Sequence, residues 1–351
     1  PLWRPTARQG SMAGVQRFRF GEERAAVSMT LTRTSGDVQR QTPLAGPGRV
    51  RRRRRSERFL PYLLALPAVA LVIGLLGYPL YRMIVVSLQQ YERPQLWGLR
   101  PASWVGLGNY THLLTDRVFW AVVQHTAVFT VVSVAISVVL GMAVALLMGR
   151  VSRWARYLMT SALMLVWAMP QLVSSQVFIW MIDADFGVVN WLIDQLPGVN
   201  FFKHSWFADP AQGWTVITAL VVWQGLPFLA ITMHAGLSQV PKDLVEAATV
   251  DGAGAWRVFA SVRLPIVRPL LGIVTTLSVI WNFQLFTQVW TLRFGKPEPS
   301  YQTLSTYAYT QAFESGRYGL GAAVSIITVI LMLGVTAFYI RQMFRVGEAE
   351  A

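Results

Sequence analysis

Six stretches of mostly apolar residues recur along the chain, and their length restricts the fold more than any other feature. An α-helix rises about 1.5 Å per residue, so about 20 apolar residues are needed to cross a hydrocarbon core of about 30 Å. The stretches that pass this test are 59–89, 119–148, 157–182, 214–234, 266–292 and 320–340. The sequence therefore predicts an all-α, polytopic membrane protein with one six-span domain over residues 59–345.

Several prolines lie inside these stretches, four of them well away from the stretch ends. Pro67, Pro79, Pro170 and Pro227 do not disqualify the spans, because neighbouring helices in a bundle can satisfy the carbonyl groups that a proline leaves without a partner. We expect them to produce kinks.

The distribution of basic residues predicts the orientation of the spans. The arginine run 51–55 lies directly before the first stretch, and such residues stay on the cytoplasmic side. The short turn that contains Arg150, Arg153 and Arg156 then also faces the cytoplasm. So does Lys242 in the long central connection. The connections predicted to lie outside also contain some Arg and Lys, so the bias is not absolute, but they hold the acidic residues Asp116, Asp183, Asp185, Asp194, Asp209, Glu298 and Glu314. Both termini are therefore expected to be cytoplasmic.

The two ends of the chain differ in composition from the spans. Residues 1–58 are rich in Arg, Gly, Ser, Thr and Pro without an apolar period, which predicts a disordered basic cytoplasmic arm. A nucleic-acid patch or a cleaved signal peptide is a weaker interpretation of the arginine run, since a stretch too long for a signal peptide follows it. Met12 or Met29 could be the natural start. Residues 346–351 are expected to form a short cytoplasmic tail.

The polar segment 238–265 separates the fourth and fifth stretches and reads as two short helices joined by a turn. Pro241 suits the first turn of a helix, where a backbone N–H has no partner in any case. Gly252 can supply the turn. A second helix over 253–262 is expected to end before Pro265, because the residue that precedes a proline is driven out of the helical region.

This segment resembles the EAA loop of the inner-membrane permease subunits of binding-protein-dependent ABC importers, particularly the sugar-permease branch. The pattern of Glu-Ala-Ala, Asp-Gly-Ala, Phe, Leu-Pro and a later Pro is met by Glu246, Ala247, Ala248, Asp251, Gly252, Ala253, Phe259, Leu264, Pro265 and Pro269. Val262 stands where isoleucine is more usual. The element 106–110, Gly-Leu-Gly-Asn-Tyr, is similar to one that precedes the second span in sugar permeases. The alternative is a solvated loop that merely joins two spans.

The resemblance implies a multi-pass subunit of a bacterial inner-membrane importer. It also implies a second homologous permease subunit, two ATP-binding cassette ATPase subunits and an extracytoplasmic solute-binding protein as partners. No cofactor is expected in this chain, because ATP and Mg would be bound by the partner ATPase. The residues implied in coupling to that ATPase are Glu246, Ala247, Ala248, Asp251, Gly252, Phe259, Leu264 and Pro265.

Polar residues within the apolar stretches are candidates for a substrate path, because burying a hydrogen-bonding group in hydrocarbon is costly. Trp281, Gln284 and Gln288 follow helical spacing and are expected to share a face, with Asn282 beside it and Gln224 in the fourth stretch. An aromatic ring with several amides suits a sugar, whose C–H faces pack on rings while its hydroxyls bond to amides. Hydrogen bonding between helices is an equally good explanation.

Other functional classes find little support in the residues. The chain has no cysteine, and its four histidines are too scattered for a metal site. No phosphate-binding loop, zinc helix or nucleophile elbow is present, so no catalytic residue is predicted and the protein is not expected to be an enzyme. No Asp or Glu occupies the centre of a span, which argues against a secondary carrier that works without ATP and favours a neutral di- or oligosaccharide. The secondary carrier and an intramembrane enzyme remain the alternatives.

Overall fold

A computed structural model of the protein describes residues 56–349. Contacts divide the chain into Pro1–Tyr62 and Leu63–Ala351, and the arrangement described below is that of the second unit. Of the expected N-terminal arm, residues 1–55 lie outside the described residues. At the other end, the last helix continues to Ala349 and so takes in most of the expected tail.

Long helices dominate the described residues. They are α1 (Ser56–Val72), α2 (Tyr78–Ser87), α5 (Arg117–Arg150), α6 (Arg153–Ala168), α7 (Gln171–Met181), α9 (Pro210–Ser238), α12 (Leu264–Phe283) and α15 (Tyr318–Ala349). Among them, five spans are long and apolar enough to cross a membrane, and α6 with α7 makes a sixth if this pair, bent by 100°, counts as one span. The all-α polytopic fold predicted from the sequence is therefore confirmed.

Short elements connect these spans. The short helices are α3 (Arg93–Leu96), α4 (Gly108–Thr115), α8 (Val188–Asp194), α10 (Lys242–Val250), α11 (Ala255–Val258), α13 (Thr287–Leu292) and α14 (Leu304–Tyr309). The π-helical or 3-10 segments are η1 (Ile73–Gly77), η2 (Phe259–Arg263), η3 (Pro299–Tyr301) and η4 (Thr310–Glu314). Strands β1 (Gln89–Gln90) and β2 (Ser103–Trp104) form an antiparallel pair.

The prolines within the spans have different consequences. Pro170 separates α6 from α7 and accounts for the bend of 100° between them, as the sequence predicts. Pro79 stands in the first turn of α2, directly after the π-helical η1. Pro227 lies inside α9, which runs on without a break. Of these three prolines, only Pro170 separates two helices.

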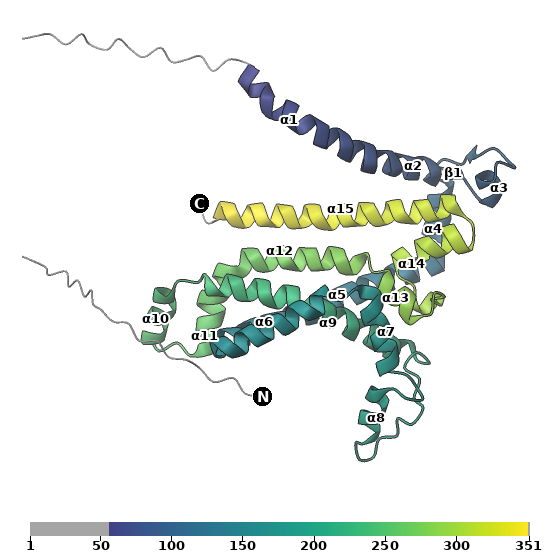
Figure 1. Cartoon of the computed structure of the whole chain (residues 1–351). Helices are drawn as coiled ribbons and strands as arrows, with labels where there is room; N and C mark the ends of the chain where they lie inside the picture. The colour runs from purple at the N-terminus through teal and green to yellow at the C-terminus, as the bar shows by residue number, and fades with distance from the viewer. Residues whose placement is uncertain (1–55, 350–351) are drawn as a thin grey trace, which may run out of the picture. The chain divides into compact units, whose positions relative to one another are not determined.

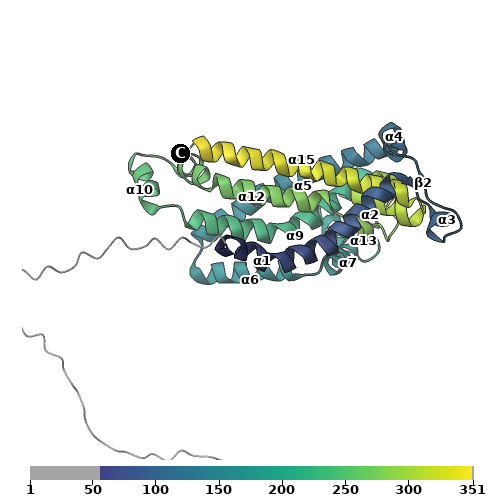
Figure 2. The same ribbon diagram turned by 90° about the horizontal axis from the view of Figure 1, so that it is seen from above.

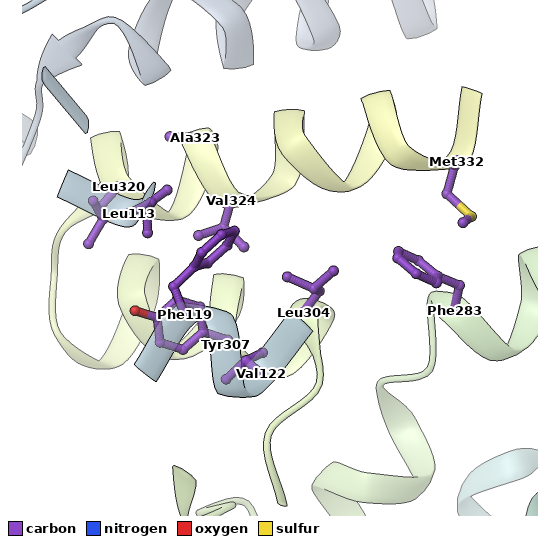
Figure 3. Close-up of a cluster of buried hydrophobic side chains, with 10 residues drawn as sticks. All are labelled: Leu113, Phe119, Val122, Phe283, Leu304, Tyr307, Leu320, Ala323, Val324 and Met332. Carbon is purple, nitrogen blue, oxygen red and sulfur yellow. The ribbon is translucent and has the colours of Figure 1, made fainter. Parts of the chain in front are cut away.

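Within the second unit, α5, α9, α12 and α15 run lengthwise, with α10 at one end and α13 and α14 at the other (Figures 1 and 2). Helices α5 and α9 approach closely, because a Cβ atom added to Gly141 would come within 2.7 Å of the Leu229 Cβ atom. Near the α13 end, Phe119 of α5 and Tyr307 of α14 pack beside Val324 of α15 (Figure 3). These buried side chains fix the four helices as a bundle.

The element 106–110 holds the end of the first span against α4. The Asn109 side-chain amide donates to the backbone carbonyls of Ser87 and Gln89, at 2.8 and 3.0 Å. The Tyr110 hydroxyl lies 2.7 Å from the Ser87 hydroxyl. This element therefore has a structural role at the α13 end of the bundle.

An arginine joins two of the long connections at the same end. The Arg293 guanidinium group lies over the rings of Phe207 and Tyr301, 4.7 and 4.6 Å from their centroids. Its Nε donates to a Glu298 carboxylate oxygen at 2.9 Å. This hydrogen bond lowers the pKa of the Glu298 carboxyl below its ordinary value. The connection before α9 and the one after α13 are thus held together.

Candidate functional site

A cavity of about 370 Å³ opens between α5, α9, α12 and the break between α6 and α7. The five residues predicted for a substrate path all line it. They are Gln224, Trp281, Asn282, Gln284 and Gln288. The structure therefore brings together residues that are up to 64 positions apart in the sequence, counted from Gln224 to Gln288.

The reason for expecting these residues together is nevertheless wrong in part. Trp281, Gln284 and Gln288 do not share one helical face, because α12 ends at Phe283 and Gln288 belongs to the separate helix α13. Leu285 lies in the intervening turn and is buried in a cluster with Val289. The Leu285 carbonyl, which has left the helix, accepts a hydrogen bond of 2.8 Å from the Thr303 hydroxyl. Tertiary packing thus ends the helix where no glycine or proline marks an end.

The glutamines divide into two kinds. Gln288 is 4% exposed and donates to the Gln224 side-chain oxygen at 2.9 Å, and Gln224 in turn donates to the Ser174 hydroxyl of α7. These two amides therefore form a hydrogen-bonded link between α13, α9 and α7, as the alternative explanation of helix-to-helix bonding requires. Gln284 is exposed, and its side-chain amide has no hydrogen-bond partner among the described residues, although its backbone N–H donates to the Ile280 carbonyl. Its amide is free to bind a ligand.

An aromatic surface lies beside the free amide. The Trp281 ring is 51% exposed and meets Phe228 edge to face, with 5.0 Å between their centroids. Asn282 is buried and donates to the Ser278 carbonyl at 2.7 Å, while its side-chain oxygen has no partner among the described residues. Because a buried carbonyl oxygen without a donor is costly, this atom favours a ligand hydroxyl. The cavity offers several aromatic rings and several amide groups.

Several lining residues were missed by sequence reasoning. Phe228 and Gln171 both line the cavity, as do the small hydroxyls of Ser137 and Ser278. Phe228 lies four residues after Gln224, one helical turn along α9, and that spacing could have identified it. Gln171 follows the break at Pro170, whose geometry the sequence does not specify.

The central loop carries the residues predicted to couple to an ATPase. Helix α10 ends in a Schellman motif, in which the Gly252 N–H donates to the Thr249 carbonyl and the Ala253 N–H donates to the Ala248 carbonyl, each at 3.0 Å. Gly252 has a φ of +80°, so the expected glycine turn is confirmed. A side chain there would be strained although nothing lies within 4 Å of its Cβ position.

The loop motif separates into a projecting part and an anchored part. Glu246, Ala247 and Asp251 are exposed, and Val250 at the end of α10 is 87% exposed. By contrast, the residues after the turn, including Phe259 and Leu264, pack against the core cluster of α5, α9 and α12. Pro265 is exposed. The first half of the motif thus faces outward while the second half fixes the loop to the bundle.

The expected end of the second short helix before Pro265 is wrong. Helix α11 continues through the π-helical η2 into α12, so the whole segment Ala255–Phe283 is one span. Pro265 stands in the first turn of α12. The wider π-helical turn directly before it leads the chain into α12, where a missing N–H is tolerated.

Comparison with known proteins agrees with this geometry. Residues 137–345 match the family described as "Binding-protein-dependent transport system inner membrane component". The chain is 38% identical over 326 residues to the diacetylchitobiose uptake system permease protein DasB of Streptomyces coelicolor, covering 89% of this chain and 99% of that protein. It is 30% identical over 285 residues to the trehalose/maltose transport system permease protein MalF of Thermococcus litoralis, covering 81% and 94%.

Solved structures show the same fold at lower identity. A chain from the crystal structure of a bacterial alginate ABC transporter, in complex with an alginate pentasaccharide-bound periplasmic protein, superposes with a TM-score of 0.70 and 17% identity. The superposition covers 83% of this chain and 96% of that chain. This likeness shows that the two chains share a fold. The chain belongs to the family of binding-protein-dependent transport system inner membrane components, and is an ABC importer permease subunit.

Proposed function

We propose that this subunit conducts a neutral di- or oligosaccharide across the cytoplasmic membrane, through the cavity at Trp281 and Gln284. The observation that carries this proposal is the combination of a half-exposed ring, a free amide and an unpartnered amide oxygen in one cavity. Rings pack on the C–H faces of a sugar, and amides exchange hydrogen bonds with its hydroxyls.

The named relatives support a sugar as the substrate class. DasB is a diacetylchitobiose uptake permease, and the MalF relative serves trehalose and maltose. All three sugars are neutral disaccharides. The described lining of the cavity likewise contains no Asp, Glu, Lys or Arg.

The α10 end is proposed to face the cytoplasm, together with both termini. Arg150, Arg153 and Arg156 lie where α5 gives way to α6, and the loop with Lys242 lies at the same end. Acidic residues such as Asp209 lie at the α13 end. Because basic residues stay on the cytoplasmic side, this asymmetry favours the orientation with α10 inside.

Partners follow from the exposed surfaces. The exposed face of α10 suits docking to an ATPase, and two such subunits would bind the ATP and Mg on which import depends. Residues of α1 and α2 are exposed along most of their length, and Trp281 is open on one side of its cavity, which favours a second permease subunit that completes the path. A solute-binding protein would deliver the sugar at the α13 end.

The test is reconstitution of the subunit with its second permease, its ATPase and its binding protein in proteoliposomes. Uptake of radiolabelled diacetylchitobiose, trehalose and maltose is measured with and without ATP. ATP-dependent uptake of one of these sugars is expected. Uptake by this subunit alone without ATP, or a complete set of subunits that moves only charged solutes, would contradict the proposal.

A further inference from the structure

A second and larger cavity, of about 1000 Å³, lies at the α10 end of the bundle. Its walls come from the end of α5, the start of α6, the end of α9 and the central loop. Its cationic side chains are Arg150, Arg156, Lys242 and Arg263. The single acidic side chain in its lining is Glu246. This cavity is therefore strongly positive, unlike the uncharged cavity at Trp281.

The cations of this cavity lack acidic partners. Within the described residues, none of the four forms an ion pair, and Glu246 forms none either. Arg156 is held by its own backbone surroundings, since its Nε donates to the Met148 carbonyl at 2.8 Å. Arg156 and Arg263 are half-buried. Because half-buried cations without a counter-charge are unfavourable, the cavity favours an anion.

The more buried part of the cavity lining is apolar and is called its floor here. Ala145 and Val258 are buried and Leu146, Leu237 and Phe259 are half-buried, whereas Arg150 and Lys242 are exposed. The floor residues come from the ends of α5 and α9 and from the start of the span Ala255–Phe283. A cationic rim above an apolar floor fits an amphiphile with an anionic head better than a soluble anion.

The cavity also lies at the level where a membrane meets water. Helices α5 and α9 are membrane spans that end beside it, at Arg150 and Ser238. On the adjoining first turns of α6, Trp154 and Tyr157 are 76% and 69% exposed. Amphipathic rings of this kind prefer the headgroup layer of a bilayer.

We propose that this cavity binds an anionic phospholipid of the leaflet at the α10 end. The phosphate group would lie among Arg150, Lys242 and Arg263, and the start of an acyl chain would cover the apolar floor. A lipid in this position would contact α10 and the bundle at once, and would thereby hold the projecting loop against the spans. The lipid site is independent of the sugar path, so it can be tested without any transport assay.

The test uses the full chain, purified in detergent with its copurifying subunits, and native mass spectrometry to count bound lipid. The probes are phosphatidylglycerol and phosphatidylcholine of the same acyl length. Tight binding of phosphatidylglycerol alone is expected. Arg150→Gln combined with Arg263→Gln should weaken that binding about 25-fold, since each membrane-proximal cation is worth about five-fold.

Matched controls separate this site from general surface charge. Arg153 lies at the start of α6, three residues after Arg150, and Arg268 lies in α12, five residues after Arg263. Both are exposed, and neither lines the cavity. Arg153→Gln with Arg268→Gln should leave phosphatidylglycerol binding within about two-fold. Replacing Arg150 and Arg263 by lysine keeps both charges, so this variant should also retain binding and shows that the site can be altered without unfolding.

Four results would overturn the proposal. Equal binding of both lipids would show that the cavity does not select for the negative charge of the headgroup. Equal weakening by the control pair would show that the cavity is not the site. If the glutamine pair released the ATPase while phosphatidylglycerol binding was unchanged, the cations would serve the protein partner instead. Displacement of the lipid by glycerol 3-phosphate at equal concentration would assign the site to a soluble phosphate.

Discussion

The two kinds of glutamine in the cavity at Trp281 predict two different phenotypes. The side-chain amide of Gln284 has no hydrogen-bond partner among the described residues, so Gln284→Ala removes a group that is available to a ligand. A neutral hydrogen bond contributes about 0.5 to 1.5 kcal/mol, which corresponds to a rise in the half-saturation concentration of about 2- to 13-fold. Assembly and thermal stability should stay at the wild-type level.

Gln288→Leu has a different expected result. It removes the 2.9 Å bond to Gln224 and leaves the side-chain oxygen of the half-buried Gln224 without that donor. An intramolecular hydrogen bond contributes about 0.5 to 1.5 kcal/mol, so the free energy of unfolding should fall by about that amount. We expect a lower melting temperature in detergent and a smaller yield of assembled complex.

Both variants are assayed in the same way, by thermal melting in detergent and by concentration-dependent sugar uptake in proteoliposomes. Gln195→Ala is the control, because Gln195 is an exposed glutamine at the end of α8, outside the cavity. The reasoning is refuted if Gln284→Ala lowers the melting temperature while Gln288→Leu does not. It is also refuted if Gln284→Ala leaves the half-saturation concentration unchanged.

Three further predictions concern the two ends of the bundle. Gly252→Val places a β-branched side chain at a φ of +80°, at a cost of about 1 to 3 kcal/mol. This variant should uncouple ATP hydrolysis from sugar uptake when both are measured in the same vesicles. Unchanged coupling would show that the central loop does not transmit the motion of the ATPase. Cysteines introduced singly at Asp185 and Ser315, both exposed at the α13 end, should react with an impermeant maleimide outside intact cells, and labelling only after lysis would reverse the orientation. Because the Arg293 hydrogen bond lowers the pKa of Glu298, its stabilisation is present above the ordinary carboxyl pKa and is lost as the pH falls through the lowered value. Limited proteolysis of the connection after α13 should therefore increase at low pH, and Glu298→Gln should make it sensitive at neutral pH as well.

The membrane spans could be predicted from short stretches of sequence, because the hydrocarbon core of a bilayer excludes most backbone structures other than a helix. A span must satisfy its own backbone hydrogen bonds, so an apolar stretch of sufficient length reads directly as a helix. The positive φ of Gly252 was also predictable, since a glycine that directly follows the last residues of a helix commonly adopts the left-handed conformation that ends it.

Features that depend on tertiary contacts were not predictable in the same way. The end of α12 at Phe283 rests on the burial of Leu285 and on a hydrogen bond from Thr303, eighteen residues further along the chain. The division of the glutamines into a bonded pair and a free amide depends on the position of Ser174 across the cavity. Composition and helical spacing contain neither fact.

The break between α6 and α7 shapes the cavity at Trp281, which is the sugar path proposed above. Helix α6 has 16 residues and rises only about 24 Å, less than the hydrocarbon thickness of about 30 Å, and α7 turns away by 100°. Met169 and Gln171, on the two sides of the break, both line the cavity at Trp281. Two helix ends, with backbone groups that lack intrahelical partners, therefore open onto a site without a titratable side chain in its described lining. Peptide dipoles do not gain or lose protons, so their hold on a polar solute would be the same in acidic and in alkaline surroundings.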